Sequence, residues 1–210
     1  LPAGLPVVGP YMDHEAGFMG VLNRSGNVMQ CSLGTAWVAN YTMPAKAKWE
    51  SSVQIVLPSL TDENWLVVQP LRAGNVAWDW ALDNFLGSDR GKALRSVEVL
   101  FKRRLLPASG SVGIPWFYVA NPLFPESVGG GALFGLSALS DRGELVRMIA
   151  LSLACEMFRV CRQLKDKGII DSLVLGGGAA KDGHFRRLFA ALFHPLPVYA
   201  ADDEQASGPR

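Results

Sequence analysis

An excess of charge of one sign is missing from this sequence. Its 20 Lys and Arg residues stand against 19 Asp and Glu residues, so the formal net charge is only +1. A nucleic-acid-binding domain usually carries a clear basic excess, so the composition argues against DNA or RNA as a partner. Charged residues make up 19% of the chain and hydrophobic residues 49%, which excludes general disorder.

Long apolar runs are missing as well. The apolar stretch 149–157 contains Glu156 and is bounded by Arg147 and Arg159. A membrane-spanning helix needs about 20 apolar residues. The first residues also lack the basic and then apolar pattern of a secretory signal. We therefore expect a cytoplasmic protein with no membrane partner.

Cysteine and histidine are scarce. Cys31, Cys155 and Cys161 have no metal-ligand spacing, so we expect buried, reduced thiols. The three histidines lie far apart in the sequence, which argues against a zinc site. No Gly-x-Ser-x-Gly turn supports hydrolase chemistry.

The chain is long enough to bury a core of its own. Its 210 residues correspond to one large domain or two small ones. It opens as if within a loop, and 202–206 reads as the first turn of a further helix. We expect the sequence to be a piece of a longer protein.

Hydrophobic periodicity predicts an α/β chain. Strands are predicted at 5–10, 28–33, 36–41, 65–68, 172–175 and 197–200. Helices are predicted to begin at Asp13 and to cover 76–82, 91–104, a long segment that begins at Asp141 or Glu144 and ends at Lys167, and a segment with Phe185, Leu188, Phe189 and Leu192 on one face. The Pro-rich segment 107–125 is predicted to be a loop. In the long helix, the apolar stripe contains Leu145, Met148, Ile149, Ser152 and Cys155.

Three local patterns suit a phosphate-bearing ligand. A glycine turn at 176–178 joins a buried strand to a helix, so its N–H groups can approach a ligand, or it merely allows a tight turn. The hairpin turn at Gly34 and Thr35 can hold phosphate oxygens or nothing. Asp13 follows a strand, where it offers a carboxylate at a sheet edge or caps a helix.

In this order the patterns resemble the C-terminal, nucleotide-binding half of the FGGY carbohydrate kinases. Residues 1–8 followed by Asp13 are similar to the segment and aspartate of the family's Gly-Asp-Gln motif. Residues 32–36 match its Ser-Leu-Gly-Thr-Ser hairpin, 131–136 its Gly-x-Phe-x-Gly-Leu stretch, and 176–181 its Gly-Gly-Gly-Ala-Lys turn. These four landmarks span nearly the whole chain.

The resemblance implies an actin-like (ribonuclease-H-like) ATPase domain over 1–210, with a mixed sheet flanked by helices. It implies that Asp13 is the catalytic base, with Mg²⁺ contacted indirectly, and that Gly34 and Thr35 hold the phosphates of ATP. The residues implied at the adenosine are Gly177, Gly178, Ala179, Lys181 and Asp182. The implied partners are ATP, Mg²⁺ and a sugar or polyol, with a homodimer also possible for such a chain.

An N-terminal sugar-binding domain and the last C-terminal helices of the family would lie outside this sequence. Because the two halves of such kinases close over their substrates, we expect the chain alone to be inactive. One alternative is a kinase-like module that binds nucleotide or sugar without turnover, since 119–126 lacks the family's Glu-Arg-x-Pro run. A dinucleotide-binding domain is disfavoured because the glycine spacing is not Gly-x-Gly-x-x-Gly.

Overall fold

The computed structural model describes residues 4, 12–21, 26–44, 54–58, 64–71, 73–117 and 130–201. The strands within these ranges are β1 (Val28–Leu33), β2 (Trp37–Pro44), β3 (Ile55–Pro58), β4 (Asn64–Pro70), β5 (Val112–Ile114), β6 (Ala132–Phe134), β7 (Ser172–Gly176) and β8 (Val198–Ala200). The helices are α1 (Asp13–Met19), α2 (Asn75–Phe85), α3 (Arg90–Arg103), α4 (Arg142–Asp166), the 3-10 helix η1 (Gly178–Lys181) and α5 (Gly183–Phe193).

Six strands form a mixed sheet in the order β3-β4-β2-β1-β7-β8. The β1 and β2 strands form an antiparallel hairpin in which Leu33 pairs with Trp37, so 34–36 make the turn. The β7 strand pairs with β1 in parallel, with Ser32 opposite Gly176. The hairpin turn and the glycine turn therefore leave the same edge of the sheet.

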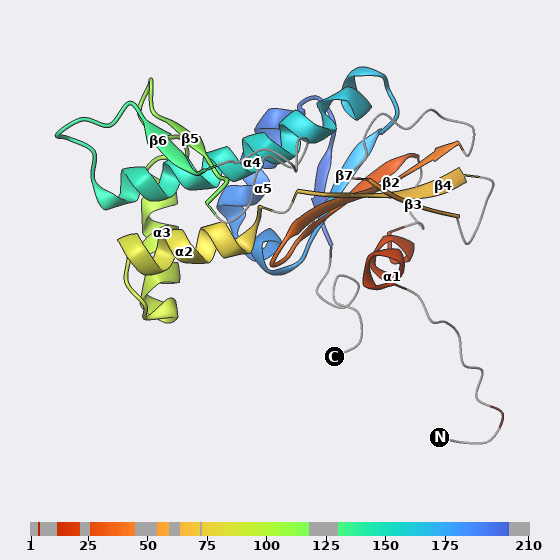
Figure 1. Ribbon diagram of the computed structural model, residues 1–210, viewed down its shortest axis with the longest axis horizontal. Helices are drawn as coiled ribbons and strands as arrows, with labels where there is room; N and C mark the ends of the chain where they lie inside the picture. The colour runs from red at the N-terminus through yellow and green to blue at the C-terminus, as the bar shows by residue number, and fades with distance from the viewer. Residues whose placement is uncertain are drawn as a thin grey trace.

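The two faces of the sheet bury different residues because side chains alternate along each strand. Met29, Cys31 and Leu33 of β1 belong to the larger core, which α2, α4 and α5 complete. Val28 points to the opposite face, where it clusters with Phe18 of α1. Figure 1 shows α1 on this second face, near the N-terminal end of the chain.

The molecule is elongated, with the six-stranded sheet at one end and α2, α3, β5 and β6 at the other (Figure 1). The long helix α4 links the two ends and begins with a cap, since the N–H of Glu144 donates to Asp141 Oδ1 at 2.7 Å. Asp89 caps α3 in the same way, accepting from the N–H of Lys92 at 3.0 Å. Both caps satisfy N–H groups that a helix start leaves unpaired.

Several sequence predictions need correction. The second hairpin strand begins at Trp37 rather than residue 36, β3 was not predicted, and β5 lies inside the Pro-rich segment predicted to be a loop. In α4, Leu145 and Cys155 are only half-buried, because the buried surface extends well beyond the predicted stripe. Cys155 is accordingly not a buried thiol, whereas Cys31 and Cys161 are. The predicted strand 5–10 and helical turn 202–206 lie outside the described residues.

Candidate functional site

The hairpin turn is held by the start of α2. The N–H of Asn75 donates to Gly34 O at 3.2 Å, and Val76 donates to Thr35 O at 3.4 Å. Gly74 permits this approach, because a Cβ there would lie 2.7 Å from Trp37 N. Thr35 stays exposed at the tip.

The Asn75 side chain links the turn to both hairpin strands. Its Nδ2 donates to Leu33 O at 3.2 Å, and its Oδ1 accepts from Trp37 Nε1 at 3.1 Å. Both the amide nitrogen and the amide oxygen of Asn75 are therefore hydrogen-bonded to the hairpin. Its position just after Gly74, at the start of a predicted helix, is the only sequence signal for this role.

The glycine turn after β7 meets the same place. Gly177 has φ +87°, and a Cβ there would lie 2.9 Å from both the carbonyl carbon and oxygen of Leu33, so a side chain is excluded by backbone strain and by contact. A Cβ on Gly178 would lie 3.7 Å from Asn75 Nδ2, which is ordinary contact. The structure therefore brings the predicted phosphate residues and glycine residues together, with Asn75 between them.

Beyond the glycine turn, η1 leads into α5. Ala179 is buried, Lys181 is exposed and Asp182 is half-buried at the start of α5. Burial raises the pKa of the Asp182 carboxyl, while the positive charges of Arg90 and Arg186 oppose that rise. The adenosine residues implied by the sequence thus lie in η1 and at the start of α5, directly after Gly177.

The end of this segment borders a cavity of about 830 Å³ between α3 and α5. Lys181, Asp182 and His184 line one wall, and Phe101 of α3 lies in the other. The His184 ring stacks on Phe101 with a centroid distance of 4.2 Å. Burial, and next the charge of Arg187, lowers the His184 pKa from 6.5 to about 3, so this imidazole is neutral at physiological pH.

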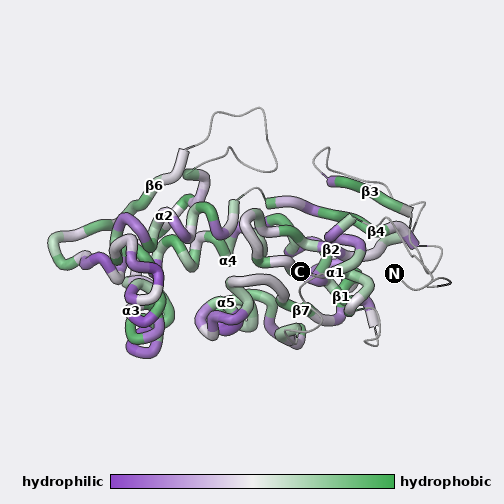
Figure 2. The backbone as a smooth tube through the Cα atoms, turned by 90° about the horizontal axis from the view of Figure 1, so that it is seen from below, coloured by the Kyte–Doolittle hydropathy of each residue, from purple (hydrophilic) through white to green (hydrophobic). Residues whose placement is uncertain are grey.

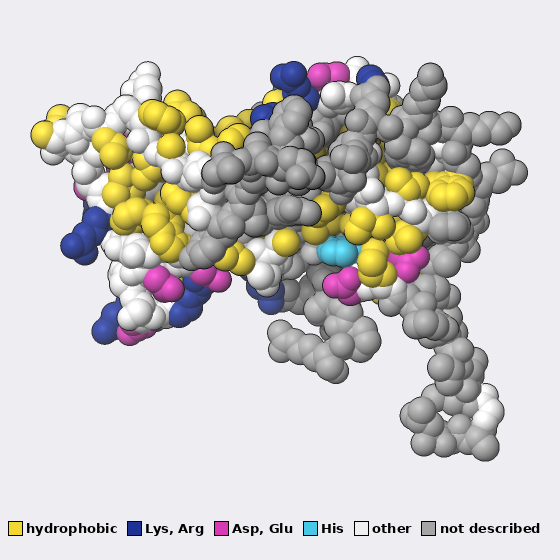
Figure 3. All heavy atoms as spheres, in the orientation of Figure 1, with side chains coloured by type: hydrophobic (Ala, Val, Ile, Leu, Met, Phe, Trp, Pro, Cys, Tyr) yellow, Lys and Arg dark blue, Asp and Glu magenta, His cyan; other side chains and the backbone are white. Residues whose placement is uncertain are grey.

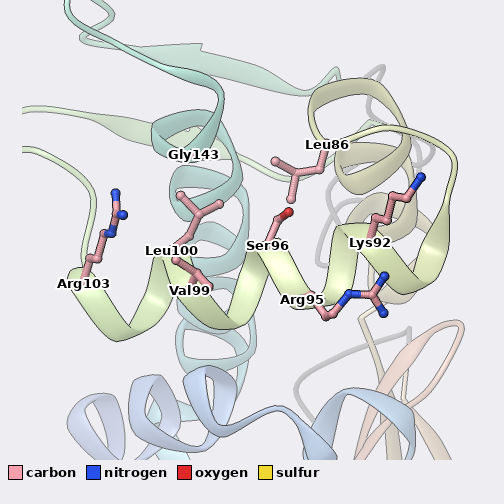
Figure 4. Close-up of a pocket in the computed structure, with 8 residues that line it drawn as sticks. All are labelled: Leu86, Lys92, Arg95, Ser96, Val99, Leu100, Arg103 and Gly143. Atoms are coloured by element: carbon pink, nitrogen blue, oxygen red, sulfur yellow. The ribbon is translucent and has the colours of Figure 1, made fainter.

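A second hollow, of about 580 Å³, lies on the other side of α3 (Figure 4). Leu86, Val99 and Leu100 make much of its lining, and Gly143 of α4 closes one side. This hollow contains none of the residues predicted to bind ATP, and it shares Arg95 with the cavity between α3 and α5.

Asp13 lies on α1, on the other face of the sheet. It is exposed, and its Oδ1 accepts from the adjacent His14 N–H at 2.9 Å. The N-cap is Met12, whose N–H donates to Glu15 Oε2 at 2.8 Å, so the reading of Asp13 as an N-cap is wrong. Buried Phe18 packs α1 against the sheet, above the two strands of the hairpin. Among the described residues, no hydrogen bond or ion pair joins Asp13 to the hairpin or the glycine turn.

The described ranges of the chain show neither a metal-binding cluster nor a membrane-spanning helix. They hold no cluster of three or more His, Cys, Asp or Glu side chains placed to bind a metal ion. No helix within them has the length and apolar character to cross a membrane.

Comparison with protein families gives a match to the FGGY family of carbohydrate kinases, C-terminal domain, over residues 29–208. The chain belongs to this family. The match confirms the resemblance seen in the sequence and includes both turns of the candidate site. Comparison with curated protein sequences gives no match.

Solved structures of FGGY-type kinases share the fold. The xylulose kinase of Rhodospirillum rubrum aligns with a TM-score of 0.79 at 20% identity, over 96% of this chain and 40% of that one. The xylulose kinase of Bifidobacterium adolescentis aligns at 0.72 and 20% identity, over 92% and 37%. The Plasmodium falciparum glycerol kinase with ADP aligns at 0.69 and 17% identity, over 85% and 36%.

These alignments confirm the predicted actin-like ATPase fold, a mixed sheet flanked by helices. The chain spans about two-fifths of the length of the Rhodospirillum kinase. The alignments do not test the roles of single residues. The roles of Asp13, Gly34, Thr35 and the adenosine residues therefore stay predictions.

Proposed function

We propose that this FGGY-family chain provides the ATP site and the catalytic base of a carbohydrate kinase, which transfers the γ-phosphoryl group of ATP to a hydroxyl of a sugar or polyol. The observation that carries the proposal is the meeting of the hairpin turn, Asn75 and the glycine turn at one edge of the sheet. Ligands of open α/β sheets gather at this kind of edge.

The arrangement suggests an orientation for the nucleotide, with its phosphates at the hairpin turn and its adenosine beyond the glycine turn. Gly34 and Thr35 would hold the β- and γ-phosphates, because a turn at a sheet edge can present backbone donors and a hydroxyl to phosphate oxygens. Gly177 and Gly178 would let the chain approach the α-phosphate and ribose closely. Lys181 and Asp182 would face the adenosine at the mouth of the cavity.

Asp13 would supply the base. Its exposed carboxylate can accept the proton of the sugar hydroxyl as that oxygen bonds to the γ-phosphorus and the bond from phosphorus to the ADP oxygen breaks. When bound, Mg²⁺ would neutralise charge on the phosphate oxygens. An exposed carboxylate such as Asp13 suits contact with that ion through water, and the chain needs no dedicated metal cage for this chemistry.

The test uses the full-length protein that contains this chain, with ATP and a panel of sugars and polyols. Substituting Asp13→Asn should lower kcat about 100- to 10,000-fold, which is the usual contribution of a general base. The KM for ATP should stay nearly constant, because Asp13 is proposed to contact the sugar hydroxyl rather than ATP. Asp83→Asn, on the exposed side of α2, is the matched control and should behave like the unchanged protein.

A kinase-like module without turnover is the second candidate. It is favoured if ADP binds, no member of the panel is phosphorylated, and Asp13→Asn leaves ADP binding unchanged. Sugar phosphorylation that is indifferent to Asp13→Asn would instead reject the proposed role of this carboxylate and keep the kinase activity.

A further inference from the structure

The lining of the cavity between α3 and α5 carries more positive charge than the uncharged adenosine group would need. Five cationic side chains line it, namely Arg95, Lys102, Lys181, Arg186 and Arg187, against the carboxylates of Glu98 and Asp182. Glu98 already pairs with Lys102 at 2.7 Å. The lining of the cavity therefore carries three more cations than carboxylates. Figure 2 shows the hydrophilic turns of α3, and Figure 3 shows Lys and Arg side chains together with Asp and Glu side chains at this end of the molecule.

Two of these cations line the cavity from different helices. Arg95 belongs to α3 and Arg186 to α5, and neither makes an ion pair within the described part of the chain. Figure 4 shows Arg95 extending from α3 on the side where α5 lies. Two guanidinium groups from different helices suit a ligand with several acceptor oxygens, because each group can donate two parallel hydrogen bonds.

The remaining wall of the cavity is rigid. Arg187 ties α5 to α3, donating to Phe101 O at 3.1 Å, so its charge meets backbone carbonyls rather than a carboxylate. His184 is 4% exposed, and its buried Nε2 has no hydrogen-bond partner among the described residues. The α5 side of the cavity thus adds the positive charge of Arg187, held in place by the Phe101 carbonyl.

We propose that this cavity holds a phosphate monoester, apart from the phosphates of ATP proposed at Gly34 and Thr35. The inference deepens the proposed function, because the cavity adjoins the residues assigned to adenosine. The phosphate can come from two sources, a phosphoryl group on the ribose of the nucleotide or a separate phosphorylated small molecule. Arg95 and Arg186 are the residues that would grip it.

The test is isothermal titration calorimetry of the full-length protein with three probes: inorganic phosphate, ADP, and ADP carrying an additional 3′-phosphate. The variant is Arg95→Gln with Arg186→Gln, and the control is Arg162→Gln, an exposed arginine of α4 outside the cavity. Both target arginines are exposed, so the fold should survive the change. Inorganic phosphate should bind at least about tenfold more weakly to the double variant, since two charge-assisted contacts are lost.

The ADP arm separates this inference from the proposed function. ADP should bind the unchanged protein and the double variant alike. If ADP does not bind while inorganic phosphate binds through the two arginines, the nucleotide site is rejected and the phosphate subsite stands. If inorganic phosphate binds the double variant as well as it binds the control, the subsite is rejected, whatever ADP does.

The third probe identifies the source of the phosphate. A preference for 3′-phosphorylated ADP over ADP that the double variant loses would support a nucleotide source. Simultaneous binding of ADP and inorganic phosphate, without that preference, would support a separate phosphorylated molecule. Either result supports the subsite.

Discussion

At the scale of single residues, His184 shows how strongly the surroundings of a side chain can shift its pKa. Its ring lies 4.2 Å from the Phe101 centroid and 5.3 Å from that of Trp78. Burial penalises the charged imidazolium, and the nearby Arg187 adds to that penalty, so the pKa falls from 6.5 to about 3. The folded protein therefore keeps His184 neutral where an exposed histidine would be protonated.

The shift predicts a dependence of stability on pH. Between pH 6.5 and about 3 the unfolded chain binds a proton at His184 that the folded chain does not. The free energy of unfolding should therefore fall with falling pH in this window, by up to about 1.4 kcal/mol per pH unit, and should be unaffected by His184 above it. Urea unfolding of unchanged protein and His184→Phe, which keeps an aromatic ring in the stack, measures this slope.

His194→Gln is the matched control, because His194 is exposed. It should keep the slope of the unchanged protein, while His184→Phe should lose the contribution of one proton. Equal slopes in the unchanged protein and His184→Phe would contradict the assignment.

The sequence predicts some residues of the candidate site and not others, for a physical reason. Gly34, Gly177 and Gly178 are visible in the sequence because sharp turns between regular elements favour glycine. The role of Asn75 depends on partners 38 and 42 residues away in the chain, Trp37 and Leu33. The chain folding that brings them together leaves no local pattern, so Asn75 was not predicted.

At the scale of elements, α4 and the segment that contains β5 are held together by two buried carboxylates. Glu144 accepts from Arg104 and from the N–H of Ala108, and Glu156 accepts from Trp116 Nε1 at 3.2 Å. Between them Gly113 lies so close to α4 that a Cβ would be 3.0 Å from Met148 O. These contacts place β5 directly on the helix.

Removing the charge of Glu144 should weaken this junction. Glu144 is 4% exposed, and the equally buried Arg147 lies 3.8 Å from its carboxylate. Glu144→Gln should lower the free energy of unfolding by about 2 kcal/mol, since hydrogen bonds to a buried charge are lost and Arg147 loses its counter-ion.

The control for this change is Glu98→Gln. Its carboxylate pairs with Lys102 on the exposed side of α3, where solvent screens the ion pair, so its loss should cost much less stability than the loss of the Glu144 charge. Guanidinium unfolding of both variants gives the comparison. Equal losses in the two would show that the Glu144 cluster does not hold β5 on α4.

The elements also show the limits of sequence patterns. Alternation found β1 and most of β2, because each face of those strands meets a different core. The short strands β3 and β5 have too few residues to show a pattern. The stripe predicted for α4 was too narrow, since β5, α2 and α5 all pack on this helix and bury residues around most of it.

At the scale of the whole molecule, the residues proposed for ATP and the proposed base come from different elements around one sheet. Gly34, Asn75 and Gly177 gather at the sheet edge beside the larger core. Asp13 sits with α1 on the other face, packed over the same hairpin. The proposed nucleotide contacts and the proposed base therefore come from separate parts of the chain.

This separation predicts that residues 1–210 alone bind ADP and do not phosphorylate sugars. The proposed ATP contacts all lie within the chain, whereas it spans only 40% of the length of the Rhodospirillum xylulose kinase that it matches. Exclusion of water and orientation of the sugar hydroxyl need surfaces that close over the site. Calorimetry with ADP and an ATP-consumption assay over the sugar panel test the two parts. Asp13→Asn should bind ADP like the unchanged chain, and rapid sugar phosphorylation by residues 1–210 would overturn the prediction.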